Sequence, residues 1–112
     1  MKQGEIYRVN LDPVVGHEIG GENLVVIVSN NTINNSFLPL TVVPLVDAAG
    51  IPPQVYGVLV AAAESGLSLD VVANCLQVRA LDQSRFTGAP EGSLSPTAMK
   101  AVEQALQRVF RV

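Results

Sequence analysis

The chain has 112 residues, of which 48% are hydrophobic and 15% are charged, and its formal net charge is −3. This length suits one compact domain, and we expect residues 1–112 to form it. The composition excludes a disordered chain, and the acidic balance argues against bulk, non-specific binding to nucleic acid. A small basic groove stays possible. The low charge content also suggests that a second copy of the chain covers some apolar surface.

The sequence favours a cytoplasmic protein with no membrane segment. No apolar run reaches the roughly 18 to 20 residues that a membrane helix needs. The start of the chain, MKQGEIYRVNLDP, lacks the apolar stretch of a signal peptide. The single cysteine, Cys75, excludes an internal disulfide and a cysteine-rich zinc site. Its apolar neighbours in DVVANCLQV indicate a small buried side chain.

Short strands make up most of the predicted structure. The first stretch, EIYRVNL, alternates apolar and polar residues as a half-buried strand does, and the Asp-Pro pair after it ends the strand. Pro44 lies inside the third predicted strand and predicts a bulge or a sheet edge there. β-branched runs bounded by turn-rich segments predict five strands, over residues 5–11, 23–30, 40–46, 55–61 and 71–78. Residues 47–54 are predicted to form a turn-rich loop between the third and fourth strands.

The C-terminal part of the chain predicts helix. Residues 79–86 indicate a short helical turn, and residues 95–110 form the clearest helical pattern. Ser95 suits the N-cap and Pro96 suits the first helical position. Strands followed by one terminal helix predict a small curled sheet or barrel that the helix closes. The apolar stripe of that helix consists of Met99, Val102, Leu106 and Val109.

Five segments in order carry a family resemblance: GEIYRVNLDPVVGHEIGG, the apolar strand ending in SNN, TVVPL, QVRALDQSR and LSPTAMKAVEQAL, together spanning Gly4 to Leu106. They resemble the MazF/PemK toxins of bacterial toxin–antitoxin systems. The resemblance implies a mostly β fold with α, a small SH3-like barrel of the MazF/PemK/CcdB type with a C-terminal helix, working as a homodimer. It also implies a metal-independent endoribonuclease without cofactor, which cuts single-stranded RNA at short sequences. A MazE-like antitoxin, with a disordered acidic tail, holds such toxins in check.

Two positions depart from the pattern of that family. The family typically has an Arg after the double glycine, as in GG-x-R-P, and a Thr just past the V-P-L-type strand. Here these positions hold Asn23 and Val46. Asn can donate hydrogen bonds but cannot shuttle a proton near neutral pH, and Val can do neither. An alternative is therefore an altered or inactive homodimer that binds antitoxin or RNA.

A histidine in the glycine-containing loop offers a substitute. His17 stands where the family commonly has Ser, and an imidazole is a natural proton carrier at neutral pH. Glu18 beside it can orient or recharge it. In the alternative interpretation His17 is a solvated loop residue and Glu18 bonds nearby backbone N–H groups. Gly16, Gly20 and Gly21 are expected to allow positive φ in a tight connection.

Candidate RNA contacts follow from the resemblance and from side-chain chemistry. Gln77 and Arg79 match the family's Q-I-R segment. Arg79 and Arg85 can contact phosphates, or can form surface salt bridges with Asp82. Phe37, in a polar loop, can stack on a base or anchor a second subunit. The other candidate aromatic, Tyr7, lies in a predicted strand, which favours core packing over stacking.

Overall fold

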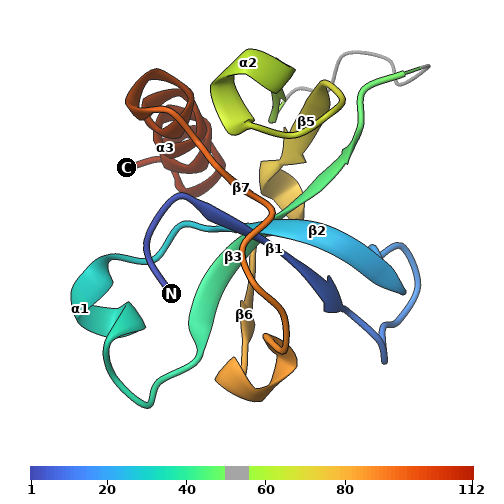
Figure 1. Ribbon diagram of the computed structural model, residues 1–112, viewed down its shortest axis with the longest axis vertical. Coiled ribbons are helices and arrows are strands. Elements are labelled where there is room, and N and C mark those ends of the chain that lie inside the picture. Colours follow the sequence, from blue (N-terminus) through green and yellow to red (C-terminus); the bar gives the residue numbers. More distant parts are fainter. Residues whose placement is uncertain (50–55) are drawn as a thin grey trace.

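The structure, a computed structural model, describes residues 1–49 and 56–112. Within them, one strongly curled sheet of seven strands wraps around itself, and a C-terminal helix lies across one side of it (Figure 1). The strands are β1 (Glu5–Asn10), β2 (Glu22–Ile27), β3 (Leu40–Asp47), β4 (Gly57–Val60), β5 (Val71–Asn74), β6 (Arg79–Leu81) and β7 (Gly92–Ser93). The helices are α1 (Asn31–Asn34), α2 (Ala62–Ser65) and α3 (Pro96–Phe110), with 3₁₀ turns η1 (Cys75–Gln77) and η2 (Gln83–Arg85).

The sheet is antiparallel, and β3 is its central strand. The main strand order is β4-β5-β3-β2-β1-β7, and β6 also pairs with β3. On one edge β3 pairs with β2; on the other it pairs first with β6 and then with β5. β3 thus belongs to two sheet segments at once, which gives the sheet its curl. The mostly β fold with a C-terminal helix, expected from the sequence, is confirmed.

Pro44 sits where β3 changes partners. The β6 pairing ends at Val42 and the β5 pairing starts at Leu45. The carbonyl of Thr41 accepts a hydrogen bond from Val28 on the β2 side. Because successive residues of a strand alternate, the nitrogen of Pro44 faces the opposite side, toward the gap between β6 and β5. Of the two predicted alternatives, a bulge or a sheet edge, the edge is therefore wrong: the strand is central, and the missing N–H falls where no ladder bond is needed.

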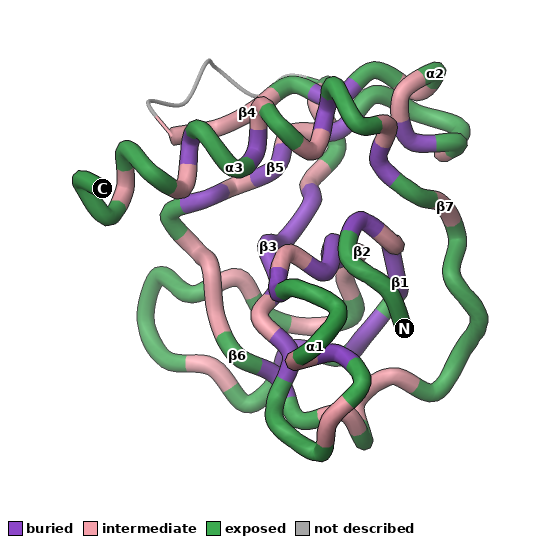
Figure 2. Tube along the Cα trace, turned by 90° about the vertical axis from the view of Figure 1, so that its left-hand side faces the viewer, coloured by how far each residue is buried: buried purple, intermediate pink, exposed green. Residues whose placement is uncertain are grey.

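Buried side chains form two clusters, one on each face of the sheet. Figure 2 shows the buried positions along the strands and on α3 in purple. The first lies between the sheet and α3 and includes Val43, Leu45 and Ala73 together with Val102 and Ala105. The second fills the inside of the curl. Its buried members are Tyr7, Val9, Leu11, Val25, Ile27, Leu40, Val42 and Leu81. Alternation along β2 and β3 sends neighbouring residues to opposite clusters, which fixes the register of both strands.

The terminal helix follows the sequence prediction. The Ser95 hydroxyl accepts a hydrogen bond from the Ala98 N–H at 3.1 Å, and Pro96 occupies the first turn. All four members of the predicted stripe pack on the first cluster. In the described part of the chain, no helix combines the length and apolarity needed to cross a membrane.

The predicted strand 71–78 ends early. After Asn74 the chain turns into η1, and Cys75 at its start is fully buried, as expected. Part of the loop predicted over 47–54, and the first residue of the strand predicted over 55–61, lie outside the described residues. The turn predicted over 79–86 divides into the short strand β6 and the 3₁₀ turn η2.

Candidate active site

The loop that joins β1 to β2 closes on itself at its base. The Leu11 N–H donates to the Gly21 carbonyl at 2.9 Å, and the Gly21 N–H donates to Asp12 Oδ1 at 3.0 Å. Gly16 and Gly21 have positive φ, of 58° and 73°. Gly20 does not: a Cβ there would lie 2.7 Å from Asp12 Oδ1. The expectation of positive φ is thus confirmed for Gly16 and Gly21. At Gly20 the absence of a side chain instead allows the Asp12 carboxylate to lie close to the backbone.

The tip of this loop carries His17 and Glu18, both exposed to solvent. Glu18 Oε1 accepts a hydrogen bond from the Val15 N–H at 2.5 Å, and the Glu18 N–H donates to the Val15 carbonyl at 3.2 Å. The carboxylate of Glu18 therefore helps to form the turn that presents His17, as the loop-carboxylate interpretation describes.

Gln77 ties this tip to the rest of the molecule. Its Nε2 donates to the His17 carbonyl at 3.0 Å, and its Oε1 accepts from the Ile19 N–H at 3.2 Å. Ile19 packs against the second core cluster. A side chain 58 residues away in sequence thus fixes the backbone on both sides of Glu18.

Two arginines hold the start of the same loop. Arg79 Nη1 donates to the Leu11 carbonyl at 3.3 Å, and Arg85 Nη1 donates to the carbonyls of residues 10 and 12 at 2.9 and 2.8 Å. The sequence left open whether these arginines contact phosphates or form salt bridges with Asp82, and the salt-bridge alternative is wrong. Asp82 instead accepts two hydrogen bonds from Ser84, which lower the pKa of its carboxyl.

A hollow of about 300 Å³ opens beside the loop tip. Its lining residues are Glu18, Leu76, Gln77, Val78 and Arg79. The structure therefore brings four of the seven predicted site residues together, since the His17 backbone is bonded to Gln77. Arg79 lines the hollow that the loop tip borders, and a guanidinium there can stabilise charge that develops on a phosphoryl group.

Asn23 and Val46 lie at the same end of the β2–β3 ladder. Leu24 and Leu45 are the last pair of the β2–β3 register, and Asn23 and Val46 are the next residues of the two strands beyond it. Leu24 and Leu45 face the first cluster, so Asn23 and Val46 face the other side. Asn23 Oδ1 accepts from the Leu24 N–H at 3.0 Å, and at the strand end Asn23 borders another hollow, away from the His17 tip.

Asn74 is a polar residue on this face that sequence reasoning missed. Val72 pairs with Val46, so the two side chains share a face. Asn74, two residues after Val72, shares that face by alternation and is half-buried. Its place on this face follows from the β3–β5 register, for which the sequence has no signal.

Phe37 lies far from these residues, at the tip of the loop before β3. Its side chain is fully exposed, at 103% of the reference area, and Leu38 beside it is 59% exposed. Gln83 Nε2 donates to the Ser36 carbonyl at 2.7 Å and to the Leu38 carbonyl at 3.0 Å, which fixes the backbone under the ring. The structure thus presents an aromatic ring on a well-bonded loop, separate from the His17 tip.

Tyr7 belongs to the core, as expected. It is 6% exposed, and its ring and that of Phe86 are nearly perpendicular, with centroids 5.5 Å apart. Its hydroxyl donates to Glu5 Oε1 at 3.0 Å. Burial and this hydrogen bond raise the pKa of Tyr7 to about 12. A base cannot stack on a ring that the protein already covers.

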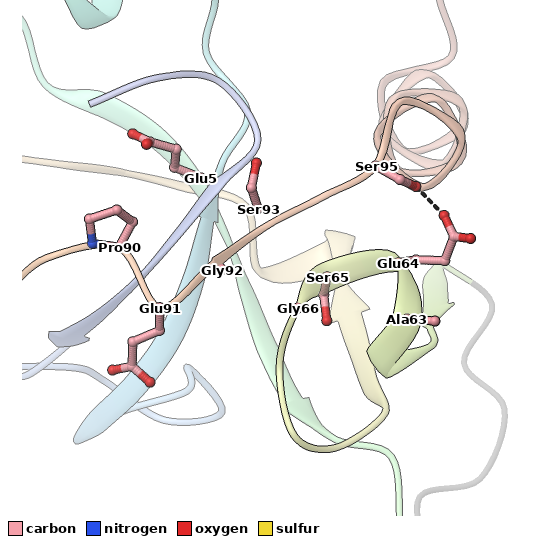
Figure 3. Close-up of a pocket in the computed structure, with 10 residues that line it drawn as sticks. All are labelled: Glu5, Ala63, Glu64, Ser65, Gly66, Pro90, Glu91, Gly92, Ser93 and Ser95. Carbon is pink, nitrogen blue, oxygen red and sulfur yellow. Dashed lines mark hydrogen bonds between the residues drawn. The ribbon is translucent and has the colours of Figure 1, made fainter.

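One of the larger hollows, of about 500 Å³, lies between β7, α2 and the start of α3 (Figure 3). Glu5, Glu64 and Glu91 line it, and the Ser95 hydroxyl donates to the Glu64 carboxylate. Carboxylates repel phosphate, so this hollow is a poor candidate for RNA. Among the described residues, no group of three or more His, Cys, Asp or Glu side chains is placed to hold a metal ion.

Sequence comparisons match nearly the whole chain. A family model described as "PemK-like, MazF-like toxin of type II toxin-antitoxin system" matches residues 2–110. Endoribonuclease MazF9 of Mycobacterium tuberculosis is 33% identical over 96% of this chain and 93% of its own length. Endoribonuclease EndoA of Bacillus subtilis is 33% identical over 96% of this chain and 91% of its own length.

Solved structures share the fold. MazF from Deinococcus radiodurans superposes with a TM-score of 0.80 at 20% identity, covering 100% of this chain and 97% of that one. A mycobacterial endoribonuclease in complex with its cognate antitoxin superposes with a TM-score of 0.75 at 21% identity, covering 100% and 94%. From the family match and the sequence relatives, the chain belongs to the PemK-like, MazF-like toxin family of type II toxin–antitoxin systems.

Proposed function

We propose that this chain is the toxin of a type II toxin–antitoxin pair and an endoribonuclease that cleaves single-stranded RNA without a metal ion. The relatives named as endoribonucleases, 33% identical over almost the whole chain, support this activity. The observation that carries the site is the loop tip: Gln77 holds the His17 backbone beside the hollow that Arg79 lines.

The reaction needs a proton carrier and a cation. A base removes the proton of a ribose 2′-OH, the 2′-oxygen attacks the adjacent phosphorus, and the bond to the 5′-oxygen breaks as an acid protonates that oxygen. The products are a 2′,3′-cyclic phosphate and a 5′-OH. We assign the proton transfers to His17 and the neutralisation of phosphoryl charge to Arg79, whose guanidinium keeps free N–H donors beyond its bond to Leu11.

The other predicted residues have supporting roles in this proposal. Glu18 shapes the turn that presents His17. Asn23 offers its amide N–H₂ to the RNA as a neutral donor, because its oxygen is already engaged by Leu24. Arg85 contacts the RNA backbone near residues 10–12, and Phe37 offers a ring on which a base can stack, worth about 1–3 kcal/mol.

The partners in this proposal are a second copy of the chain and a MazE-like antitoxin, acting in the cytoplasm, with residues 1–112 as a single domain. The structure of a mycobacterial relative with its cognate antitoxin supports the second partner. A row of half-buried and exposed apolar side chains, on the side of the sheet away from α3, supports the first. Leu59, Val72 and Val46 are neighbours along this row, and Leu59 is 68% exposed.

The Asn23–Val46 pair favours a second candidate: a homodimer that binds antitoxin or RNA without cutting it. To separate the two, the purified protein is incubated with a long single-stranded RNA in EDTA. Discrete fragments support the endoribonuclease. Intact RNA at high protein concentration, together with retained binding of the antitoxin, supports the binding module.

A further inference from the structure

We propose that Gln77 is a positioning residue for the reaction, which holds the His17 backbone in place and does not itself bind RNA. This inference rests on the proposed function. It changes the role that the sequence suggested for Gln77, because each polar atom of its side chain already makes one hydrogen bond to the loop, which fixes the side chain there.

The two hydrogen bonds are complementary. Nε2 donates to a carbonyl, that of His17, and Oε1 accepts from an N–H, that of Ile19. Rotating the amide by 180° would set donor against donor and acceptor against acceptor, so only one orientation satisfies both partners. Together the bonds restrain the backbone on either side of the loop tip, and hence the point from which the imidazole projects.

We call the two hydrogen bonds from Gln77 to the loop the clamp, and Gln77 itself is firmly anchored in the protein. Gln77 ends η1, whose first residue, Cys75, is fully buried in the first core cluster. The Cys75 N–H donates to the Tyr56 carbonyl at 3.2 Å, and its carbonyl accepts from the Val78 N–H at 3.4 Å. Gln77 therefore connects an exposed loop to a rigid part of the core, which is what a positioning residue requires.

The clamp is also electrically neutral. Glu18, Arg79 and His17 lie around the same hollow or beside it. An ionised side chain at position 77 would add a charge beside these groups, whereas an amide fixes the backbone and adds no charge. The position of the loop tip and the charges around it are thereby supplied by different residues.

Amide hydrogen exchange tests the clamp without any RNA. In Gln77→Ala the Ile19 N–H loses its acceptor, and we expect its exchange to quicken by about tenfold, the effect of losing one hydrogen bond. Gln77→Glu keeps an acceptor for Ile19 but loses the donor to His17, so it should fall between Gln77→Ala and the unmodified protein. Gln104→Ala, the same change on the exposed face of α3, should leave Ile19 exchange unchanged.

Cleavage kinetics test the link to the reaction. Gln77→Ala should lower kcat by about tenfold or more with a smaller change in KM, because misplacing a reacting group costs rate more than binding. In a His17→Ala background the same substitution should have no further effect. A residue with a merely structural role, or one that binds RNA directly, would lower cleavage in both backgrounds.

Each outcome decides between these roles. Faster Ile19 exchange with a loss of kcat that depends on His17 supports the proposal. Unchanged exchange, or faster exchange with unaffected cleavage, overturns it, and so does a KM effect that persists without His17. If the unmodified protein cuts no RNA, the proposed function fails, while the exchange measurement still judges the clamp by itself.

Discussion

Asn23 and Val46 lie directly beyond the Leu24–Leu45 pair that ends the β2–β3 ladder, and by strand alternation their side chains point to the same side of the sheet. These are the two positions at which the sequence departs from the family pattern of Arg and Thr. The structure puts both departures at one place. A cation and a hydroxyl that would lie side by side in the family pattern are replaced together by an amide and an apolar side chain.

Restoring both residues should increase cleavage. In the double variant Asn23→Arg, Val46→Thr, a charge and a hydroxyl return to adjacent positions, and we expect the rate to rise by about tenfold or more, since one well-placed donor is typically worth 10²–10³-fold. The measurement is kcat/KM on a single-stranded RNA substrate. Gln104→Arg, which adds the same charge on α3, is the control and should leave the rate unchanged. A double variant that cleaves no faster than this control would contradict the prediction.

Removing the imidazole should abolish most of the activity. His17→Ala deletes the proposed proton carrier, and general acid–base catalysis is typically worth about 10²–10⁴-fold. Val15→Ala truncates another exposed side chain of the same loop and keeps the backbone bonds to Glu18. Cleavage of a mixed RNA substrate should fall in the first variant and persist in the second. Equal rates in the His17 variant and the unmodified protein would remove His17 from the mechanism.

Gly20 should tolerate no side chain, although its φ is unremarkable. A Cβ there would lie 2.7 Å from both Asp12 Oδ1 and Val14 Cγ2, and Asp12 is fixed by its bond to Gly21. Gly20→Ala should therefore lower the free energy of unfolding by about 1–3 kcal/mol, as overpacking does. Gly88→Ala, where a Cβ meets nothing within 4 Å, is the matched control. Thermal melts of the two variants give the comparison, and equal Tm values would contradict the geometry.

Cys75 should make stability fall at high pH. Burial raises the pKa of its thiol from 9.0 to about 11. Between these values the unfolded chain has lost the thiol proton and the folded protein retains it, so the unfolded state is favoured as pH rises. Urea unfolding at pH 8 and pH 10 should show a loss of about 1 kcal/mol that Cys75→Ala does not show. The same pH dependence in that variant would assign the loss to other groups, such as Tyr7.

Local patterns predicted the elements of the fold well. The helix of residues 96–110 could be predicted because its cap and its apolar stripe both depend on residues close together in the sequence. The buried Cys75 and Tyr7 followed from their apolar or strand-like surroundings in the same way. Pro44 was misjudged because its tolerance depends on a change of strand partner, which involves residues about 30 positions away.

The site was harder to predict for the same reason. The sequence identified His17, Gln77 and Arg79 as candidates. It could not show that both polar atoms of the Gln77 side chain form hydrogen bonds with the loop backbone. Nor could it show that Arg79 and Arg85 bond backbone carbonyls and not Asp82. Such bonds join segments more than 55 residues apart and depend on the tertiary fold rather than on local spacing.

The central claim is that the chain cuts single-stranded RNA by attack of a ribose 2′-OH. The most direct measurement is the chemistry of the fragment ends after incubation of the purified protein with a long RNA in EDTA. Ends that carry a 2′,3′-cyclic phosphate on one side and a 5′-OH on the other, at discrete positions and absent with His17→Ala, are the predicted result. RNA that stays intact at high protein concentration, or fragments with 3′-OH and 5′-phosphate ends, would contradict it.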